Sequence, residues 1–83
     1  MNKVEIYTST YCPYCVRAKQ LLDSKGGDYE EVNFDKNPDQ KLEIMKKHNW
    51  RTVPIILIGG ELIGGYDQLV SLERAKKLDE LLN

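Results

Sequence analysis

Long apolar runs and cysteine are both scarce in this chain, which has two cysteines among 83 residues. No segment approaches the roughly 20 successive apolar residues that a transmembrane helix needs. Charged residues stand at positions 3 and 5, Lys3 and Glu5, too early for the N-terminal segment to contain the apolar core of a signal peptide. We therefore expect no membrane partner and a cytoplasmic location.

An excess of charge of either sign is also absent, since 12 Lys and Arg residues stand against 13 Asp and Glu residues. The basic residues are scattered among acidic ones, so no basic patch for nucleic acid or anionic lipid is predicted. Three prolines and six glycines in a chain with 41% hydrophobic residues are typical of an ordinary globular protein. A chain this short has room for one domain over residues 1–83 with one modest core, and we expect a monomer.

The two cysteines, Cys12 and Cys15, are separated by two residues. A disulfide at that spacing closes a very short loop, stabilises a fold little, and would be reduced in the cytosol. A closed zinc site usually has four ligands, whereas this chain offers two cysteines and the distant His48. We predict no metal site, and we interpret His48 as a solvated surface residue. The spacing favours thiol chemistry.

Alternation of polarity predicts a first strand at residues 3–7, with Tyr7 on its outward side. A helical pattern then begins at Pro13 and stops at the glycine pair 26–27. Residues 29–34 predict a second strand. A strand, helix and strand in this order are most simply built as a right-handed crossover between parallel strands.

Asn37 followed by proline predicts the start of a second helix, with Asn37 as its N-cap. We expect this helix to run to about residue 48 and to bury Leu42 and Met45. The pattern thus places a helix between the second strand and the next apolar run.

Residues 53–58 form a continuous apolar run, which predicts a strand covered on both faces. Two glycines then predict a two-residue hairpin to a fourth strand at residues 61–63. A final helix is expected to the end of the chain, with an inner face formed by Leu69, Leu72, Ala75, Leu78 and Leu82. The predicted order is βαβαββα, an α/β fold with a four-stranded mixed sheet and helices on both faces.

Cys12 stands where an N-cap residue is expected, directly before Pro13 at the first helical position. There the backbone N–H of Cys15 comes within reach of the Cys12 sulfur. A helix terminus alone supplies about 0.3–1 kcal/mol, less than the ~1.4 kcal/mol of one pKa unit, so direct hydrogen bonds must supply the rest of any thiol activation. We interpret Cys12 as the exposed nucleophile and Cys15 as the resolving thiol.

Three motifs in order, Cys12-Pro13-Tyr14-Cys15, Thr52-Val53-Pro54 and Gly64-Gly65-Tyr66-Asp67, resemble the dithiol glutaredoxin family along the whole chain. The resemblance implies a thioredoxin-like fold and a glutathione-dependent thiol–disulfide oxidoreductase that reduces glutathione mixed disulfides and protein disulfides. It implies glutathione as reducing co-substrate, with no tightly bound cofactor. The implied partners are glutathione and disulfide-containing or glutathionylated proteins.

The resemblance also implies a set of glutathione-binding residues. Thr52 and Val53 precede a cis-proline, Pro54, and the Val53 backbone pairs with the cysteinyl part of glutathione like an added strand. In the same way, Gly65, Tyr66 and Asp67 hold the γ-glutamyl end at a helix N-terminus, and Tyr14 belongs to the same binding site. Without the resemblance, Pro54 merely opens a strand and Asp67 merely caps a helix.

Three positions depart from the family pattern. Ser9 stands where the family usually has a lysine near the glycine carboxylate of glutathione, and Ile55 and Gln68 stand where it has a polar residue and a second acid. The site is therefore expected to be less polar than usual, with the missing charge to be supplied by Arg17, Lys19 or Arg51.

Two other interpretations stay open from the sequence. A thioredoxin-like carrier reduced by a flavoprotein reductase would use the same fold and the same cysteine pair. A binding module that shares a glutathione-ligated [2Fe–2S] cluster between two protomers would use Cys12 as ligand, an arrangement that Pro13 is expected to disfavour.

Overall fold

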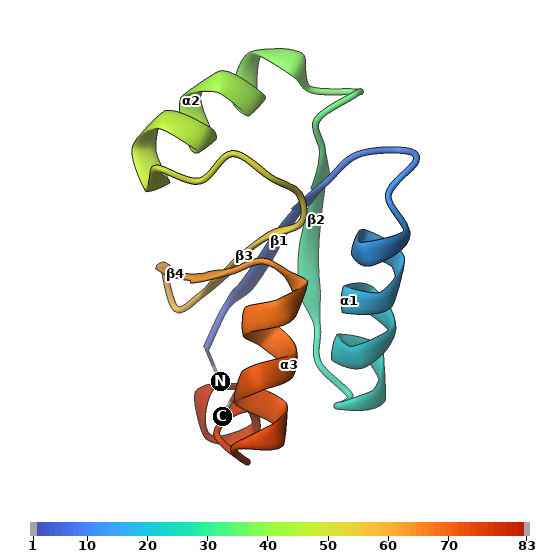
Figure 1. The fold of residues 1–83 in the computed structure, drawn as a ribbon, viewed down its shortest axis with the longest axis vertical. Coiled ribbons are helices and arrows are strands. Elements are labelled where there is room, and N and C mark those ends of the chain that lie inside the picture. Colours follow the sequence, from blue (N-terminus) through green and yellow to red (C-terminus); the bar gives the residue numbers. More distant parts are fainter. Residues whose placement is uncertain (1, 83) are drawn as a thin grey trace.

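The computed structural model describes residues 2–82. Its elements, in chain order, are β1 (Val4–Thr8), α1 (Pro13–Ser24), β2 (Tyr29–Asn33), α2 (Pro38–His48), β3 (Ile55–Ile58), β4 (Glu61–Gly64), α3 (Tyr66–Arg74) and α4 (Leu78–Leu82). They form one sheet in the order β2-β1-β3-β4 (Figure 1). β1 is parallel to β2, and β3 is antiparallel to both β1 and β4. The α/β class and the four-stranded mixed sheet are confirmed.

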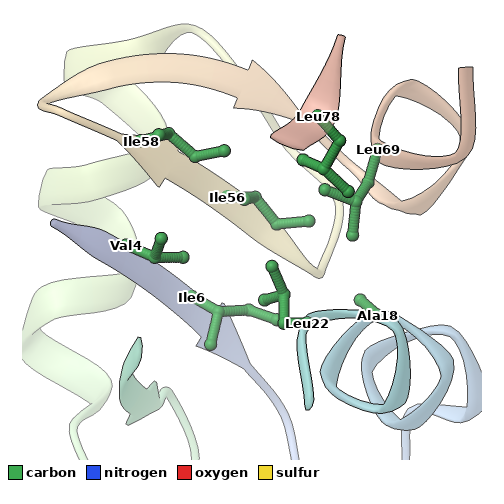
Figure 2. Packing of buried hydrophobic residues seen from close by; sticks show 8 residues of the cluster. All are labelled: Val4, Ile6, Ala18, Leu22, Ile56, Ile58, Leu69 and Leu78. Atoms are coloured by element: carbon green, nitrogen blue, oxygen red, sulfur yellow. The ribbon is translucent and has the colours of Figure 1, made fainter. Parts of the chain in front are cut away.

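One face of the sheet is covered by α1, α3 and α4 through a cluster of buried side chains. Figure 2 shows side chains from β1 and β3 pointing toward these helices. The cluster consists of Val4, Ile6, Ala18, Leu22, Ile56, Ile58, Leu69 and Leu78. Burial of these side chains fixes α1 and α3 against the sheet, and the N-terminal ends of both helices belong to the site described below.

The other face is covered by α2, and here two expectations were wrong. Tyr7 does not point outward: it is buried, stacks on Phe34 with ring centroids 5.4 Å apart, and donates to Glu5. Burial is the main cause that raises its pKa to about 12. Leu42 is 66% exposed, because the inward face of α2 is formed by Ile44 and Met45 instead.

Three helices end in the same hydrogen-bond pattern, the Schellman motif, in which a residue of positive φ follows the helix. At α1 this residue is Gly26 (φ 67°), as the glycine pair predicted. At α2 and α3 it is Asn49 (φ 51°) and Lys76 (φ 60°). The expected single C-terminal helix is therefore wrong: the chain turns at Lys76 into the separate α4, and the order is βαβαββαα.

The β3–β4 turn has the predicted two-residue form, since Gly59 and Gly60 both have positive φ (61° and 83°). The N-cap expected at Asn37 makes no capping bond, because its side-chain amide donates to the Asn33 carbonyl. Within residues 2–82, no helix has the length and apolar character needed to cross a membrane.

Candidate active site

Cys12 is the N-cap of α1, as predicted. Its sulfur accepts a hydrogen bond from the Cys15 backbone N–H at 3.0 Å, and Pro13 occupies the first helical position. Cys15 is 1% exposed, whereas Cys12 is partly exposed. The two residues form a disulfide, with Cα atoms 5.1 Å apart. Cys12 is therefore the more accessible of the two cysteines to a ligand in solution.

The loop before β3 brings a second predicted motif to the first. The Val53–Pro54 peptide bond is cis, and the Val53 carbonyl oxygen lies 3.9 Å from the Cys12 sulfur. Val53 is partly exposed and Pro54 is buried. Val53 therefore lies beside Cys12 at a partly exposed position.

A cavity of about 400 Å³ opens next to this loop. All seven residues expected to bind glutathione line it, together with two that the sequence analysis did not assign to binding. The lining residues are Tyr14, Trp50, Thr52, Val53, Pro54, Gly65, Tyr66, Asp67 and Gln68. The structure therefore brings the three sequence motifs to one cavity.

The N-terminus of α3 forms one wall of the cavity. Gly65 is the N-cap, and its backbone N–H donates to the Gln68 side chain at 2.9 Å. The expectation that Asp67 caps the helix was wrong, because Asp67 is its second residue and its side chain is exposed. Gly64 has a φ of 123°, and a Cβ there would lie 2.8 Å from the Gln68 Cγ atom. Glycine at 64 is thus required by both conformation and space.

The loop before Cys12 is held by residues from the end of β2. The Thr10 backbone N–H donates to Asp35 at 2.7 Å, and the Asn33 side-chain amide donates to the Thr10 hydroxyl at 3.3 Å. The hydrogen bond from the Thr10 N–H is the main cause that lowers the pKa of Asp35. These residues were not predictable as part of the site, since no local signal in the sequence connects partners 23 and 25 positions apart.

The three candidate cations are placed differently. Lys19 is paired with Glu31 at 3.1 Å. Burial raises the pKa of Glu31, but hydrogen bonds from Thr8 and Lys19 outweigh it and leave the pKa lowered. Arg17 lies over the Tyr14 ring, 5.5 Å from its centroid, and Arg51 is exposed. Lys19 therefore already has a carboxylate partner, Glu31, within the same chain.

Trp50, the one tryptophan of the chain, is placed by the Schellman motif that ends α2. Its ring atom Cζ2 lies 3.8 Å from the point where a Cβ of Gly65 would stand. The indole nitrogen of Trp50 and the Nε2 atom of His48 are buried without a hydrogen-bond partner among residues 2–82. His48 is thus half-buried, and the expectation of a solvated side chain was wrong. Among the described residues, no group of three or more His, Cys, Asp or Glu side chains is placed to hold a metal ion.

Comparisons with known proteins agree with this geometry. A family model described as Glutaredoxin matches residues 4–63. The chain is 51% identical over 83 residues to "Glutaredoxin" of Pseudomonas aeruginosa, covering 100% of this chain and 99% of the relative. It is 46% identical over 82 residues to "Glutaredoxin 3" of Escherichia coli K12, covering 99% of each.

Solved structures show the same likeness. A buckwheat glutaredoxin–glutathione complex superposes with a TM-score of 0.92 at 33% identity, over 98% of this chain and 76% of that one. Glutaredoxin from Brucella melitensis superposes with a TM-score of 0.86 at 43% identity, over 99% and 89% of the two chains. The thioredoxin-like fold implied by the motifs is confirmed.

Proposed function

This chain belongs to the glutaredoxin family of glutathione-dependent thiol–disulfide oxidoreductases, and from this premise we propose the roles of its site residues. Cys12 is the nucleophile and Cys15 the resolving thiol. The observation that carries both roles is the hydrogen bond from the Cys15 N–H to the Cys12 sulfur, combined with the burial of Cys15. A donor aimed at sulfur favours its thiolate, the reactive form.

Reduction of a glutathionylated substrate uses Cys12 alone. Its thiolate attacks the glutathione sulfur, the substrate–glutathione S–S bond breaks, and the substrate leaves as a thiolate that takes a proton from water. A second glutathione thiolate then attacks the glutathione sulfur of the adduct. Glutathione disulfide leaves and the Cys12 thiolate is restored. One free glutathione is consumed per turnover, because the other half of the glutathione disulfide comes from the substrate.

Reduction of a protein disulfide uses both cysteines. Cys12 forms a mixed disulfide with one substrate sulfur, and Cys15 attacks the Cys12 sulfur to release the second substrate thiol. The product is the Cys12–Cys15 disulfide, the state that this structure contains. Two glutathione molecules then reduce it.

The cavity beside Cys12 is the proposed seat of glutathione. The backbone of Val53, a partly exposed residue of the cavity lining, suits pairing with the cysteinyl part. The N–H groups at the start of α3 suit the γ-glutamyl carboxylate, and the Asp67 carboxylate suits the ammonium group of the same end. Support comes from the position of these groups around one cavity and from the glutathione complex of the buckwheat relative.

Disulfide-containing or glutathionylated proteins are the proposed substrates, in a monomeric protein that works in the reducing cytoplasm. A Cys12–Cys15 pair with one buried sulfur suits this cycle, because the cytosol supplies glutathione as reductant. Family membership favours glutathione over a flavoprotein reductase as the electron donor.

A coupled assay tests the proposal. The reduction of a mixed disulfide of glutathione and cysteine is followed by NADPH oxidation, with glutathione and glutathione reductase in one reaction and thioredoxin reductase in a parallel one. We expect turnover only in the first. Turnover that depends on thioredoxin reductase and not on glutathione contradicts the proposal and supports the thioredoxin-like carrier.

A further inference from the structure

Large apolar side chains are exposed around the cysteine pair on the side of α1. Tyr11 is 95% exposed, Tyr14 53% and Val16 48%. Among residues 2–82, the one other large apolar side chain exposed to this extent is Leu42, on α2. Exposed apolar side chains gathered at one place mark interaction surfaces more often than scattered ones do. Val16 stands two positions after Tyr14 in the helix and therefore points to a different side of α1. We name the surface formed by Tyr11, Tyr14 and Arg17 the α1 rim.

Arg17 gives the α1 rim a positive charge in a defined place. Its guanidinium carbon lies 5.5 Å from the centroid of the Tyr14 ring, a cation–π distance. The Tyr14 ring in turn lies against Tyr66, with centroids 5.9 Å apart. Arg17 is therefore placed by a row of aromatic rings that begins at the wall of the glutathione cavity.

The charge of Arg17 is not neutralised within the described part of the chain. The ion pairs there belong to Lys3, Lys19 and Lys25, and none involves Arg17. The first turn of α1 contains no acidic residue. Arg17 also does not line the glutathione cavity, so its charge is available to a different part of the substrate.

We propose that the α1 rim binds the polypeptide around the reactive cysteine of a protein substrate, and that Arg17 selects substrates with an acidic residue next to that cysteine. Tyrosine and arginine are the side chains that most often dominate binding energy at protein interfaces, and complementary charge adds selectivity. A single cation in a chain of net charge −1 does not suit nucleic acid, which is bound through several phosphates. This inference rests on the proposed function and specifies its substrates.

Two matched peptides test the inference. Each contains one glutathionylated cysteine beside the same apolar residue, with aspartates flanking the cysteine in one and lysines in the other. The quantity measured is the ratio of kcat/KM for the acidic peptide to that for the basic one, at low ionic strength. We expect the unaltered protein to favour the acidic peptide by about two- to five-fold, the effect of one exposed ion pair, and the ratio to fall toward one at high salt.

Variants of α1 locate the effect. Arg17→Gln is expected to remove the preference and Arg17→Glu to reverse it, whereas Lys19→Gln, which removes the same charge from the same helix, is expected to keep it. Equal rates for both peptides in the unaltered protein overturn the inference, and so does a preference that persists in Arg17→Glu or disappears equally in Lys19→Gln. The mixed disulfide of glutathione and cysteine, assayed in parallel, separates the two proposals, since failure to reduce it contradicts the proposed function itself.

Discussion

The two faces of the sheet are covered by helices that pack very differently. α1, α3 and α4 together bury Cys15, Ala18, Leu22, Leu69 and Leu78, whereas α2 has no fully buried residue. On the α2 side the cluster is formed mainly by strand residues and Phe34, and two buried polar atoms there have no hydrogen-bond partner among residues 2–82. The difference divides the site between a tightly packed part and a loosely packed part.

The two parts contribute different chemistry. The tightly packed face fixes the start of α1, which holds Cys12, and the start of α3, which forms one wall of the cavity. The segment that leads from α2 to β3 contributes Trp50, Thr52 and Val53 to the lining of the same cavity. Thiol activation and the backbone N–H groups at the start of α3 depend on exact placement and suit the tightly packed face, whereas the lining contributed by the segment after α2 tolerates adjustment. Four predictions test this division, from the largest expected effect to the smallest.

Cys12→Ser is expected to reduce both deglutathionylation and protein-disulfide reduction to the uncatalysed rate. The reason is that a hydroxyl is neither ionised at neutral pH nor a competent partner in disulfide exchange. The measurement is the coupled assay with a glutathionylated peptide. Unchanged thermal unfolding of the variant under reducing conditions serves as the control. More than a trace of remaining deglutathionylation contradicts the role given to Cys12.

Leu22→Ala and Leu42→Ala make the same change in helices on opposite faces. Leu22 is fully buried, so its truncation is expected to cost about 2–5 kcal/mol of unfolding free energy. Leu42 is 66% exposed, and its truncation is expected to change stability by less than about 0.5 kcal/mol. Urea unfolding measures both. Similar costs for the two variants would contradict the burial of Leu22 and the exposure of Leu42 on which the comparison rests.

Asp35→Asn tests how the end of β2 holds the loop before Cys12. The folded pKa of Asp35 is lowered from 3.8, chiefly by the Thr10 N–H. The ionised group therefore stabilises the fold above pH 3.8, and this contribution is lost as the pH falls through the lower folded pKa. The variant is expected to be less stable than the parent near neutral pH and to differ from it progressively less in acid. A difference that stays constant with pH excludes this ionisation as the cause.

Ser9→Lys tests the position that lacks the family's lysine. A cation near the Cys12 sulfur favours the thiolate, so the variant is expected to have a lower Cys12 pKa and tighter glutathione binding. Thiolate absorbance followed against pH measures the first effect. An unchanged or raised pKa would mean that another cation already supplies the charge or that the side chain at position 9 points away from the site.

The sequence predicted best those features that depend on neighbouring residues. Cys12 followed by proline predicted the N-cap, and the glycine pairs at 26–27 and 59–60 predicted a helix end and a turn, all of which the structure confirms. Glycine signals positive φ because it has no Cβ. Asn49 and Lys76 take the same conformation without that signal, which is why the end of α3 was missed.

Features that depend on tertiary packing were not predictable in the same way. Leu42 is one of the apolar residues of α2, but Ile44 and Met45 are the α2 residues that pack against the sheet. The cis bond at Pro54 came only from the resemblance, since about 5% of bonds before proline in folded proteins are cis. Trp50 is placed at the site by the end of α2, and Asp35 by a hydrogen bond to Thr10, which is 25 positions away in the sequence. Neither residue belongs to a local motif.

Cys15→Ser gives the most direct test of the central claim, that Cys12 attacks and Cys15 resolves. Reduction of a glutathionylated substrate needs Cys12 and free glutathione, so this activity should survive in the variant. With a protein disulfide as substrate, the variant should instead accumulate a mixed disulfide at Cys12, visible by mass spectrometry, because no neighbouring thiol remains to release it. Loss of both activities together with no trapped adduct would contradict the account, since Cys15 would then be needed to activate Cys12 or to hold its helix.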